Sequence, residues 1–386
     1  MRIYYCTDIT LDDRSAETVH IDEICSNLAR LQHTVVLYAP KPPHWVPKGY
    51  RGVLISAPRQ LRSIFFQTRL FLRLLRDVYC DRPDVLYVRH NVLLCAPTLI
   101  GALFSIPVVL EVNGRLEQES KLIDHSFVGR ALLRAGIFGV LESFNMHQAA
   151  ALIAVTSGIK DYLLKKYSIS AGKVHVIGNG VDLDLFKPLA DADLRTKLNL
   201  DESSFYIGYI GSFYPWQGLR YLVEAARGVS EKRPKCKFLI VGSGEEGAYL
   251  SSYIEKAKLE NAVEIRSAVS HTFVPPYIHA LDICVSYPTA FRAGGTSPIK
   301  MYEYLACGKP VVLSDIAGQR EEFASAAFYA APESVPALER ALITLIDDAQ
   351  MRRELGSRGR VFVQEGHSWQ AVAKRVAEVC FDVIED

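Results

Sequence analysis

The segment LDICVSYPTAFRAGGTSPIKMYEYLACGKPVVLSD (Leu281–Asp315) contains one strand–helix–strand unit and decides the fold. Two apolar runs in it, LDICVSYP and PVVLSD, have the length and β-branched content of buried strands. Between them, Pro298 suits the first turn of a helix that continues through about Ala306. Two buried strands separated by a helix predict a parallel sheet covered by helices on both faces.

The same alternation of strands and helices extends along the whole chain. Strand candidates in the first half are RIYYC, HTVVLYAP, GVLISAP, DVLYVRH, PVVLEVNG, ALIAVTS and KVHVIGN, and those in the second half are FYIGYIGS, KFLIVGSG, AVEIRSAV, LDICVSYP, PVVLSDI and AAFYAA. A chain of 386 residues is long enough for two cores. Two such series predict two doubly wound α/β domains. We expect the domains to span 1–187 and 188–367, with the last helix, 368–386, packed back on the first domain.

Composition and charge narrow the class of protein. The chain is 49% hydrophobic and 23% charged, which is typical of a soluble globular protein, and its net charge of +1 does not suggest a nucleic-acid partner. It has no run of 18 apolar residues, and its start, MRIYYCTDIT, resembles a strand rather than a secretory signal, so we expect a cytoplasmic location. The eight cysteines form no Cys-x-x-Cys pair, which favours reduced thiols in the core and gives no metal-ligand spacing.

The glycine-rich start of the helix near residue 298 is a candidate anion site. Free N–H groups and the positive end of the helix dipole favour an anion there, and Thr296 or Ser297 can cap the helix. Lys300 adds a positive charge, and Glu303 lies far enough into the helix to accept hydrogen bonds from a ribose diol. The local pattern leaves two interpretations open: a nucleoside diphosphate site, or an ordinary capped helix with a solvated glutamate. The fingerprint Gly-x-Gly-x-x-Gly is absent after the first strand, which disfavours an NAD enzyme.

Four segments in chain order carry a resemblance to a known family. They are ALIAVTSGIKDYL (151–163), GNGVDLDLF (178–186), IGYIGSFYPWQG (207–218) and SPIKMYEYLACGKPVV (297–312). Together with the two-domain strand pattern they resemble the family 4 retaining glycosyltransferases over nearly the whole chain. The resemblance implies the GT-B architecture, in which two Rossmann-like domains face each other across a cleft. It also implies a nucleotide-sugar donor, retention of the anomeric configuration, and no metal or other cofactor. We expect a UDP-sugar first and a GDP-sugar next.

The resemblance implies a donor site in the second domain, with two departures from the family pattern. The second residue of the family's Glu-x7-Glu pair corresponds to Glu303, but the first position is Gly295. The family's Gly-Arg…Lys-Gly loop has Ser212 and Gln217 at its cation positions. Another cation should therefore face the leaving diphosphate, because stabilising that charge is usually the largest catalytic term. Lys300 and Arg292 are the nearest candidates in sequence. The full predicted donor set is Gly211, Ser212, Gln217, Gly218, Gly242, Arg266, Arg292, Gly294, Gly295, Thr296, Ser297 and Ile299.

The first domain should contribute residues near the sugar and the acceptor. Family members often carry a histidine at the position of Asn113. The resemblance therefore implies that Glu111, Asn113 and Arg115 lie near the sugar. Catalytic candidates are Lys300, Glu303, Asn113 and Glu111, and acceptor-side candidates are Ser15, Thr18, His20, Arg89 and Arg115. The resemblance makes the leaving phosphate the base for the incoming hydroxyl, since no protein nucleophile is evident. Glu111 and Glu17 stay open as alternative nucleophiles.

Residues 59–79 form a basic amphipathic pattern, RQLRSIFFQTRLFLRLLRDVY, and no acidic residue occurs between Lys41 and Arg76. Such a helix can lie on an anionic lipid surface, with Trp45 as an interfacial anchor. The alternative is a helix packed on the sheet with an arginine-rich outer face. Membrane contact would suggest the inner face of the cell membrane and a saccharide or polyprenyl-linked acceptor, in the assembly of a surface polysaccharide or glycolipid.

Two other functions stay open from the sequence. A catalytically impaired scaffold that binds a nucleotide-sugar would explain Gly295, Ser212 and Gln217. A GT-B-fold sugar-nucleotide epimerase would need acid and base residues that we cannot assign.

Overall fold

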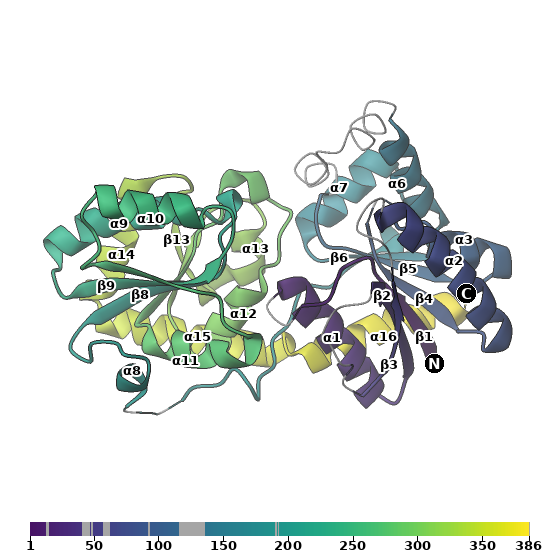
Figure 1. Cartoon of the computed structure of the whole chain (residues 1–386), viewed down its shortest axis with the longest axis horizontal. Helices are drawn as coiled ribbons and strands as arrows, with labels where there is room; N and C mark the ends of the chain where they lie inside the picture. The colour runs from purple at the N-terminus through teal and green to yellow at the C-terminus, as the bar shows by residue number, and fades with distance from the viewer. Residues whose placement is uncertain are drawn as a thin grey trace. The chain divides into compact units, whose positions relative to one another are not determined.

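The computed structural model describes residues 1–12, 15–40, 47, 49–56, 62–91, 93–115, 136–189, 191 and 193–385. Trp45 and residues 59–61 of the predicted basic helix lie outside this described part. The chain divides into two units (Figure 1). The first comprises Met1–Gly178, Gly295–Ser297 and Trp369–Asp386, and the second comprises Asn179–Gly294 and Pro298–Ser368.

The first unit is built on a seven-stranded parallel sheet with the order β3-β2-β1-β4-β5-β6-β7. Its strands are β1 (Arg2–Cys6), β2 (Thr34–Pro40), β3 (Arg51–Ile55), β4 (Val85–Arg89), β5 (Val108–Val112), β6 (Ala151–Ala154) and β7 (Val174–Val176). Its helices are α1 (Ala16–Arg30), α2 (Arg62–Cys80), α3 (Ala96–Phe104), α6 (Ile137–Gln148), α7 (Ser157–Tyr167), η1 (Ala171–Lys173) and α16 (Trp369–Glu385). The chain winds outward in both directions from the β1–β4 pair, and ligands of such sheets bind at the carboxyl ends of the strands near this switch.

The second unit repeats this design with a six-stranded parallel sheet in the order β10-β9-β8-β11-β12-β13. The strands are β8 (Phe205–Ser212), β9 (Cys236–Ser243), β10 (Val263–Arg266), β11 (Ile283–Ser286), β12 (Val311–Ser314) and β13 (Phe328–Ala330). The helices are α8 (Leu194–Lys197), η2 (Pro215–Gln217), α9 (Leu219–Lys232), α10 (Gly247–Lys256), η3 (His271–Phe273), α11 (Val274–Ala280), η4 (Ala290–Arg292), α12 (Ile299–Ala306), α13 (Gln319–Phe323), η5 (Ala324–Ala326), α14 (Val335–Asp347) and α15 (Ala349–Gly366). Helices cover both faces of this sheet, as Figure 1 shows for α9 and α10 on one side and α11 and α15 on the other. The predicted pair of doubly wound parallel sheets is confirmed.

The boundary between the units differs from the predicted one at 187/188. The second unit begins at Asn179, because Val181 and Phe186 are buried in its core. The Val181 backbone also forms an isolated parallel bridge with Ser368 of the same unit. At the other end of the chain, α16 packs on α1, and the ring of Trp369 meets the ring of His20 edge-on at 5.3 Å.

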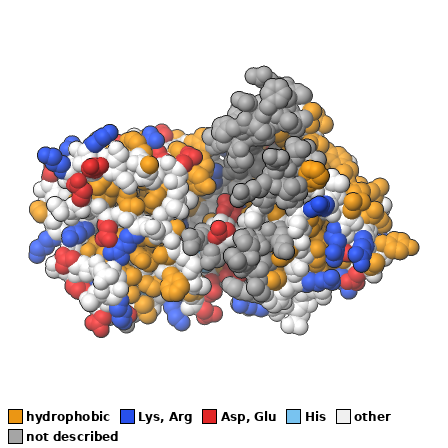
Figure 2. All heavy atoms as spheres, viewed as in Figure 1, with side chains coloured by type: hydrophobic (Ala, Val, Ile, Leu, Met, Phe, Trp, Pro, Cys, Tyr) orange, Lys and Arg blue, Asp and Glu red, His pale blue; other side chains and the backbone are white. Residues whose placement is uncertain are grey.

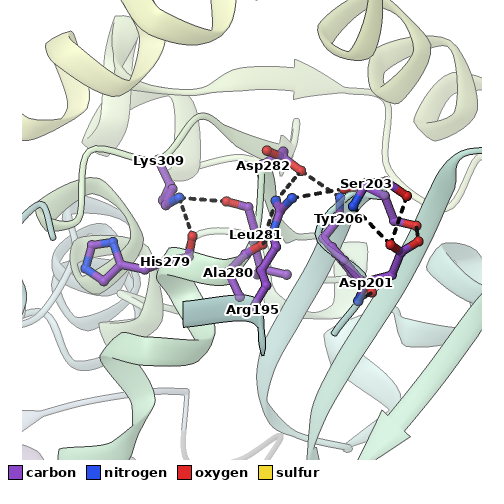
Figure 3. Close-up of polar contacts among 10 residues, drawn as sticks. Arg195, Asp201, Ser203, Tyr206, His279, Ala280, Leu281, Asp282 and Lys309 are labelled. Carbon is purple, nitrogen blue, oxygen red and sulfur yellow. Dashed lines mark hydrogen bonds and ion pairs between the residues drawn. The ribbon is translucent and has the colours of Figure 1, made fainter. Parts of the chain in front are cut away.

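A polar cluster holds the amino end of β11 (Figure 3). It lies at the edge of the second sheet opposite the carboxyl ends of the strands. Arg195 of α8 forms an ion pair with Asp282 at 2.8 Å and also donates to the carbonyl oxygens of Ala280 and Ser204. Asp282 accepts a hydrogen bond of 2.7 Å from the backbone N–H of Tyr206. Lys309 donates to the carbonyl oxygens of His279 and Leu281 at 2.9 and 2.7 Å. These contacts tie β8, β11 and the start of β12 into one rigid frame.

Helix α2 has one face in the core and a mixed outer face. Phe66, Leu70, Leu74 and Val78 recur at every fourth position and are buried against the sheet. The outer face carries Arg69 and Arg76 among exposed apolar residues. Exposed apolar side chains occur on α2, on its neighbour α3 and on α6, which packs on α3: Phe65, Leu72, Leu75, Tyr79, Leu99, Leu103 and Val140. Figure 2 shows hydrophobic and basic side chains together over this region.

Two further features concern the class of protein. Six of the eight cysteines are buried, and all eight are free thiols in the described part of the chain. Within the residues that the structure describes, no helix is both long enough and apolar enough to cross a membrane.

Candidate functional site

Helix α12 begins at the carboxyl end of β11, beside the switch between β8 and β11. The prediction that Thr296 or Ser297 caps this helix is wrong, because Pro298 is the N-cap and forms no side-chain capping bond. The residue before a proline is disfavoured in the helical region, so the helix cannot start before Pro298, and Pro298 itself is extended with ψ 119°. The N–H groups of Ile299 and Lys300 therefore open the first turn, where a helix provides no internal acceptor. Gly294 precedes this turn, whereas residues Gly295–Ser297 group with the first unit.

Lys300 points from α12 toward the loop after β8. Its Nζ donates to the Tyr209 hydroxyl at 2.6 Å and to the Gln217 side-chain oxygen at 2.9 Å. The Tyr209 hydroxyl in turn donates to the carbonyl oxygen of Ser212 at 2.8 Å. Gly211 leaves room for this arrangement, since a Cβ there would lie 3.1 Å from Nζ. Lys300 thus contacts Gln217 directly and Ser212 through Tyr209. These are the two loop positions at which the resembling family has cations.

The surroundings of Lys300 favour the neutral form of its side chain and so lower its pKa. The pKa of Lys300 is lowered to about 7, mainly by burial; the charge of Glu303 partly opposes this shift, and the charge of Arg292 adds to it. The guanidinium of Arg292 lies 5.9 Å from the centre of the Trp216 ring, which stacks on Tyr214 at 4.6 Å. Lys300 and Arg292 are therefore two basic side chains at the same strand ends.

Glu303 has a partner that the sequence prediction missed. The Glu303 side chain is 9% exposed, and its Oε1 lies 2.6 Å from Nε2 of His271 on η3. The ring of His271 rests 5.1 Å from the ring of Phe186, which is fully buried. A lone histidine in the turn after β10 carries no sequence signal for this pair, because 32 residues separate the two partners.

Three predicted donor residues make contacts within the framework of the second unit. Arg266 forms an ion pair with Glu264 at 2.6 Å and donates to the Leu198 carbonyl oxygen at 2.6 Å, so its guanidinium is already neutralised at the edge strand β10. The assignment of Arg266 to the donor site stays a prediction. Gly242 is required by a close backbone approach, since a Cβ there would lie 1.8 Å from the Gly211 carbonyl oxygen at φ +155°. Gly218 serves as the N-cap of α9.

In the first unit, Glu111 is the centre of a buried network at the ends of β4 and β5. Its carboxylate is 2.8 Å from His20 Nε2 and 3.0 Å from Arg89 Nη1, and it accepts hydrogen bonds from the Tyr87 hydroxyl and the Asn113 amide. Burial alone would raise the pKa of Glu111, but His20, Arg89 and Asn113 outweigh it and lower the pKa to about 2. Four predicted residues from three segments meet here, and Tyr87 is the member that the prediction missed.

The remaining acceptor-side candidates of the first unit, Ser15, Thr18 and Arg115, make different contacts. Ser15 is the N-cap of α1, and its hydroxyl accepts from the Thr18 N–H at 3.1 Å and donates to the Thr18 hydroxyl at 2.8 Å. These two side chains thus stabilise the start of the helix rather than offering free groups to an acceptor. The Arg115 guanidinium lies 5.5 Å from the centre of the Tyr162 ring, and its Nε has no hydrogen-bond partner among the described residues.

Comparisons with known proteins agree with this architecture. A family model for "Glycosyltransferase Family 4" matches residues 18–185, and one for "Glycosyl transferases group 1" matches residues 190–362. The alpha-D-kanosaminyltransferase of Streptomyces kanamyceticus is 24% identical over 290 residues, which cover 73% of this chain and 72% of that relative. A GDP-mannose-dependent monoacylated alpha-(1-6)-phosphatidylinositol monomannoside mannosyltransferase of Corynebacterium glutamicum is 26% identical over 59% of this chain and 62% of its own length.

Among solved structures, Anabaena HepE in complex with UDP superimposes with a TM-score of 0.76 at 18% identity. The match covers 99% of this chain and all of that structure. At this level of identity the likeness establishes a shared fold of two Rossmann-like domains.

Proposed function

The chain belongs to the group 1, family 4 glycosyltransferases, and from this premise we propose that it transfers a sugar from a nucleotide-sugar donor to a saccharide or lipid-linked acceptor with retention of configuration. One observation carries the proposal. The start of α12 combines open N–H groups, the Lys300 ammonium and the Glu303 carboxylate at the carboxyl ends of β8 and β11. This order of groups matches the diphosphate and ribose of a nucleotide.

The contacts of Lys300 support the proposal that a cation on helix α12 replaces the two cations that the resembling family carries on the loop after β8. Gln217 stands where the resembling family has lysine, and its oxygen holds the Lys300 ammonium at 2.9 Å. Lys300, with Arg292 behind it, would neutralise the leaving diphosphate without a metal ion. The phosphates would lie at the N–H groups of Ile299 and Lys300, and the ribose would lie at Glu303.

The state of Glu111 supports the leaving phosphate as the base. A carboxylate with a pKa of about 2 that already accepts hydrogen bonds from four side chains is a weak base and a weak nucleophile. Its role in this proposal is to position Arg89, His20 and Asn113. The departing diphosphate would then take the proton of the acceptor hydroxyl on the same face of the sugar.

We expect UDP as the carrier, with GDP next. Anabaena HepE is described in complex with UDP, whereas the corynebacterial relative is named as GDP-mannose-dependent. The test is turnover of UDP- and GDP-sugars in EDTA with saccharide and polyprenyl-linked acceptors, followed by NMR of the product's anomeric proton. Release of the nucleoside diphosphate with the donor's configuration kept in the product supports the proposal, while an inverted product contradicts it.

Replacing Glu303 with glutamine should weaken binding of UDP by roughly tenfold, because the ribose hydroxyls then donate to a neutral amide oxygen instead of a carboxylate. Calorimetric titration measures the effect. Glu260→Gln, an exposed change in the turn after α10, is the matched control, and both variants should keep the wild-type unfolding temperature. An unchanged affinity in the Glu303 variant would contradict the ribose assignment.

The outer surface of α2, α3 and α6 supports a lipid-linked acceptor. Its exposed apolar residues, with Leu72 at 59% and Tyr79 at 86%, surround Arg69 and Arg76. Apolar and basic side chains together suit an anionic bilayer. We propose that this surface rests on such a membrane.

Vesicle sedimentation tests this part. The double variant Leu72→Ser/Arg76→Gln should bind phosphatidylglycerol-containing vesicles at least about tenfold more weakly, from the loss of one apolar side chain and one charge. Arg227→Gln, exposed on α9 of the second unit, should bind like the wild type. Equal wild-type binding to neutral and anionic vesicles would overturn the preference for an anionic membrane, and absence of binding to either would overturn the membrane contact itself.

A further inference from the structure

The pair between His271 and Glu303 is a feature that the proposed reaction does not itself require. Nε2 of His271 is 2.6 Å from Oε1 of Glu303, and the side chains are 21% and 9% exposed. The imidazole packs against Phe186, which is buried in the core of the second unit, and this contact limits its movement on that side. Glu303 is thereby held by a side chain from a different element, η3, which follows the edge strand β10.

Without such a partner, the carboxylate has an obvious competitor on its own helix. Lys300 and Glu303 are three residues apart on α12, a spacing that brings oppositely charged side chains together. The two charges already act on each other, because Glu303 favours the charged form of Lys300. Direct pairing would neutralise both groups and remove them from the ligand at once.

We propose that His271 is a positioning residue that holds Glu303 apart from Lys300, so that the carboxylate stays available to the ribose diol and the ammonium to the diphosphate. This inference rests on the proposed function. Tyr209 and Gln217 hold Lys300, and His271 holds Glu303. A carboxylate has about four lone-pair positions, so one bond to His271 leaves acceptor sites for the diol. Fixing the carboxylate before the ligand arrives lowers the entropic cost of binding.

Ligands that differ by one hydroxyl distinguish positioning of Glu303 by His271 from packing of the His271 ring against Phe186. UDP and 2′-deoxy-UDP, and likewise GDP and 2′-deoxy-GDP, are titrated calorimetrically into wild type, His271→Phe, His271→Gln and Thr272→Ala. Phenylalanine keeps a ring against Phe186 without a hydrogen-bond donor, and glutamine keeps a donor. Thr272 is an exposed neighbour on the same turn.

In the wild type, loss of the 2′-hydroxyl should weaken binding roughly tenfold to a hundredfold, as for a hydrogen bond to a charged group. His271→Phe should reduce this ratio to less than about threefold, while His271→Gln and Thr272→Ala should keep most of it. If His271→Phe keeps the wild-type ratio, the positioning role is overturned although the proposed function stands. If the wild type binds none of the four nucleotides, the proposed function itself fails.

Discussion

Replacing Lys300 with alanine is expected to lower kcat/KM for the nucleotide-sugar on the order of a hundredfold to a thousandfold, the usual loss when a donor that stabilises developing negative charge is removed. The side chain is the cation held nearest to the loop positions Ser212 and Gln217, where the resembling family has arginine and lysine. Initial-rate kinetics with a UDP-sugar measures the effect. Lys256→Ala, an exposed change on α10, should leave kcat/KM within about twofold of the wild type, as surface substitutions usually have small effects.

The same residue gives the donor affinity a dependence on pH. Because the pKa of Lys300 is about 7 in the free enzyme, the cation is mostly present at pH 6 and mostly absent at pH 8. Affinity for a UDP-sugar, whose diphosphate does not titrate in this range, should therefore rise as the pH falls from 8 to 6. Lys300→Arg stays charged and should remove most of this dependence. A steep dependence that persists in the arginine variant would mean that another group titrates.

Replacing Glu111 with alanine is expected to destabilise the protein by about 3–5 kcal/mol, the usual cost of removing one partner from a buried ion pair. Arg89 and His20 would be left without the anion that they share. Urea unfolding monitored by circular dichroism measures the change. Glu378→Ala, an exposed change on α16 of the same unit, should stay within about 0.5 kcal/mol of the wild type.

Acid should remove the same stabilisation in the wild type. The pKa of Glu111 is about 2 in the folded protein and near its ordinary value of about 4.5 when unfolded. Its contribution is therefore fully present above about pH 4.5 and is lost as the pH falls from there toward 2, by an amount on the order of 3 kcal/mol. Urea unfolding at pH 7, 4 and 3 should show a larger loss in the wild type than in Glu111→Gln. Parallel losses in both proteins would contradict the low pKa.

The sequence predicts the fold well because strands buried on both faces of a parallel sheet have uninterrupted apolar sequences. Every predicted strand lies on an observed one, from RIYYC to AAFYAA. The domain boundary is less accurate, since Val181 and Phe186 give no local sign of which core they enter. Such a choice depends on long-range packing rather than on periodicity.

The site is predicted in part for a similar reason. Arg89, Glu111 and Asn113 stand at or just after strand ends, where polar residues after an apolar run are conspicuous. Tyr87 and His271 are missed, because a tyrosine inside a strand and a single histidine in a turn look like ordinary framework residues. Arg266 has the same strand-end position as Arg89, and each pairs with a glutamate, Glu264 for Arg266 and Glu111 for Arg89. Only the tertiary structure shows that Arg89 shares its partner with His20, whereas Arg266 also donates to the Leu198 carbonyl oxygen.

The most direct test of the account is calorimetric titration of wild type and Lys300→Ala with UDP, GDP, ADP, CDP and dTDP in EDTA. We predict that the wild type binds UDP, or next GDP, without metal, and that Lys300→Ala binds it at least about tenfold more weakly through the loss of a charged hydrogen bond. Absence of binding in EDTA that Mg²⁺ restores, or equal affinity in the two proteins, would contradict the claim that α12 and Lys300 carry the diphosphate.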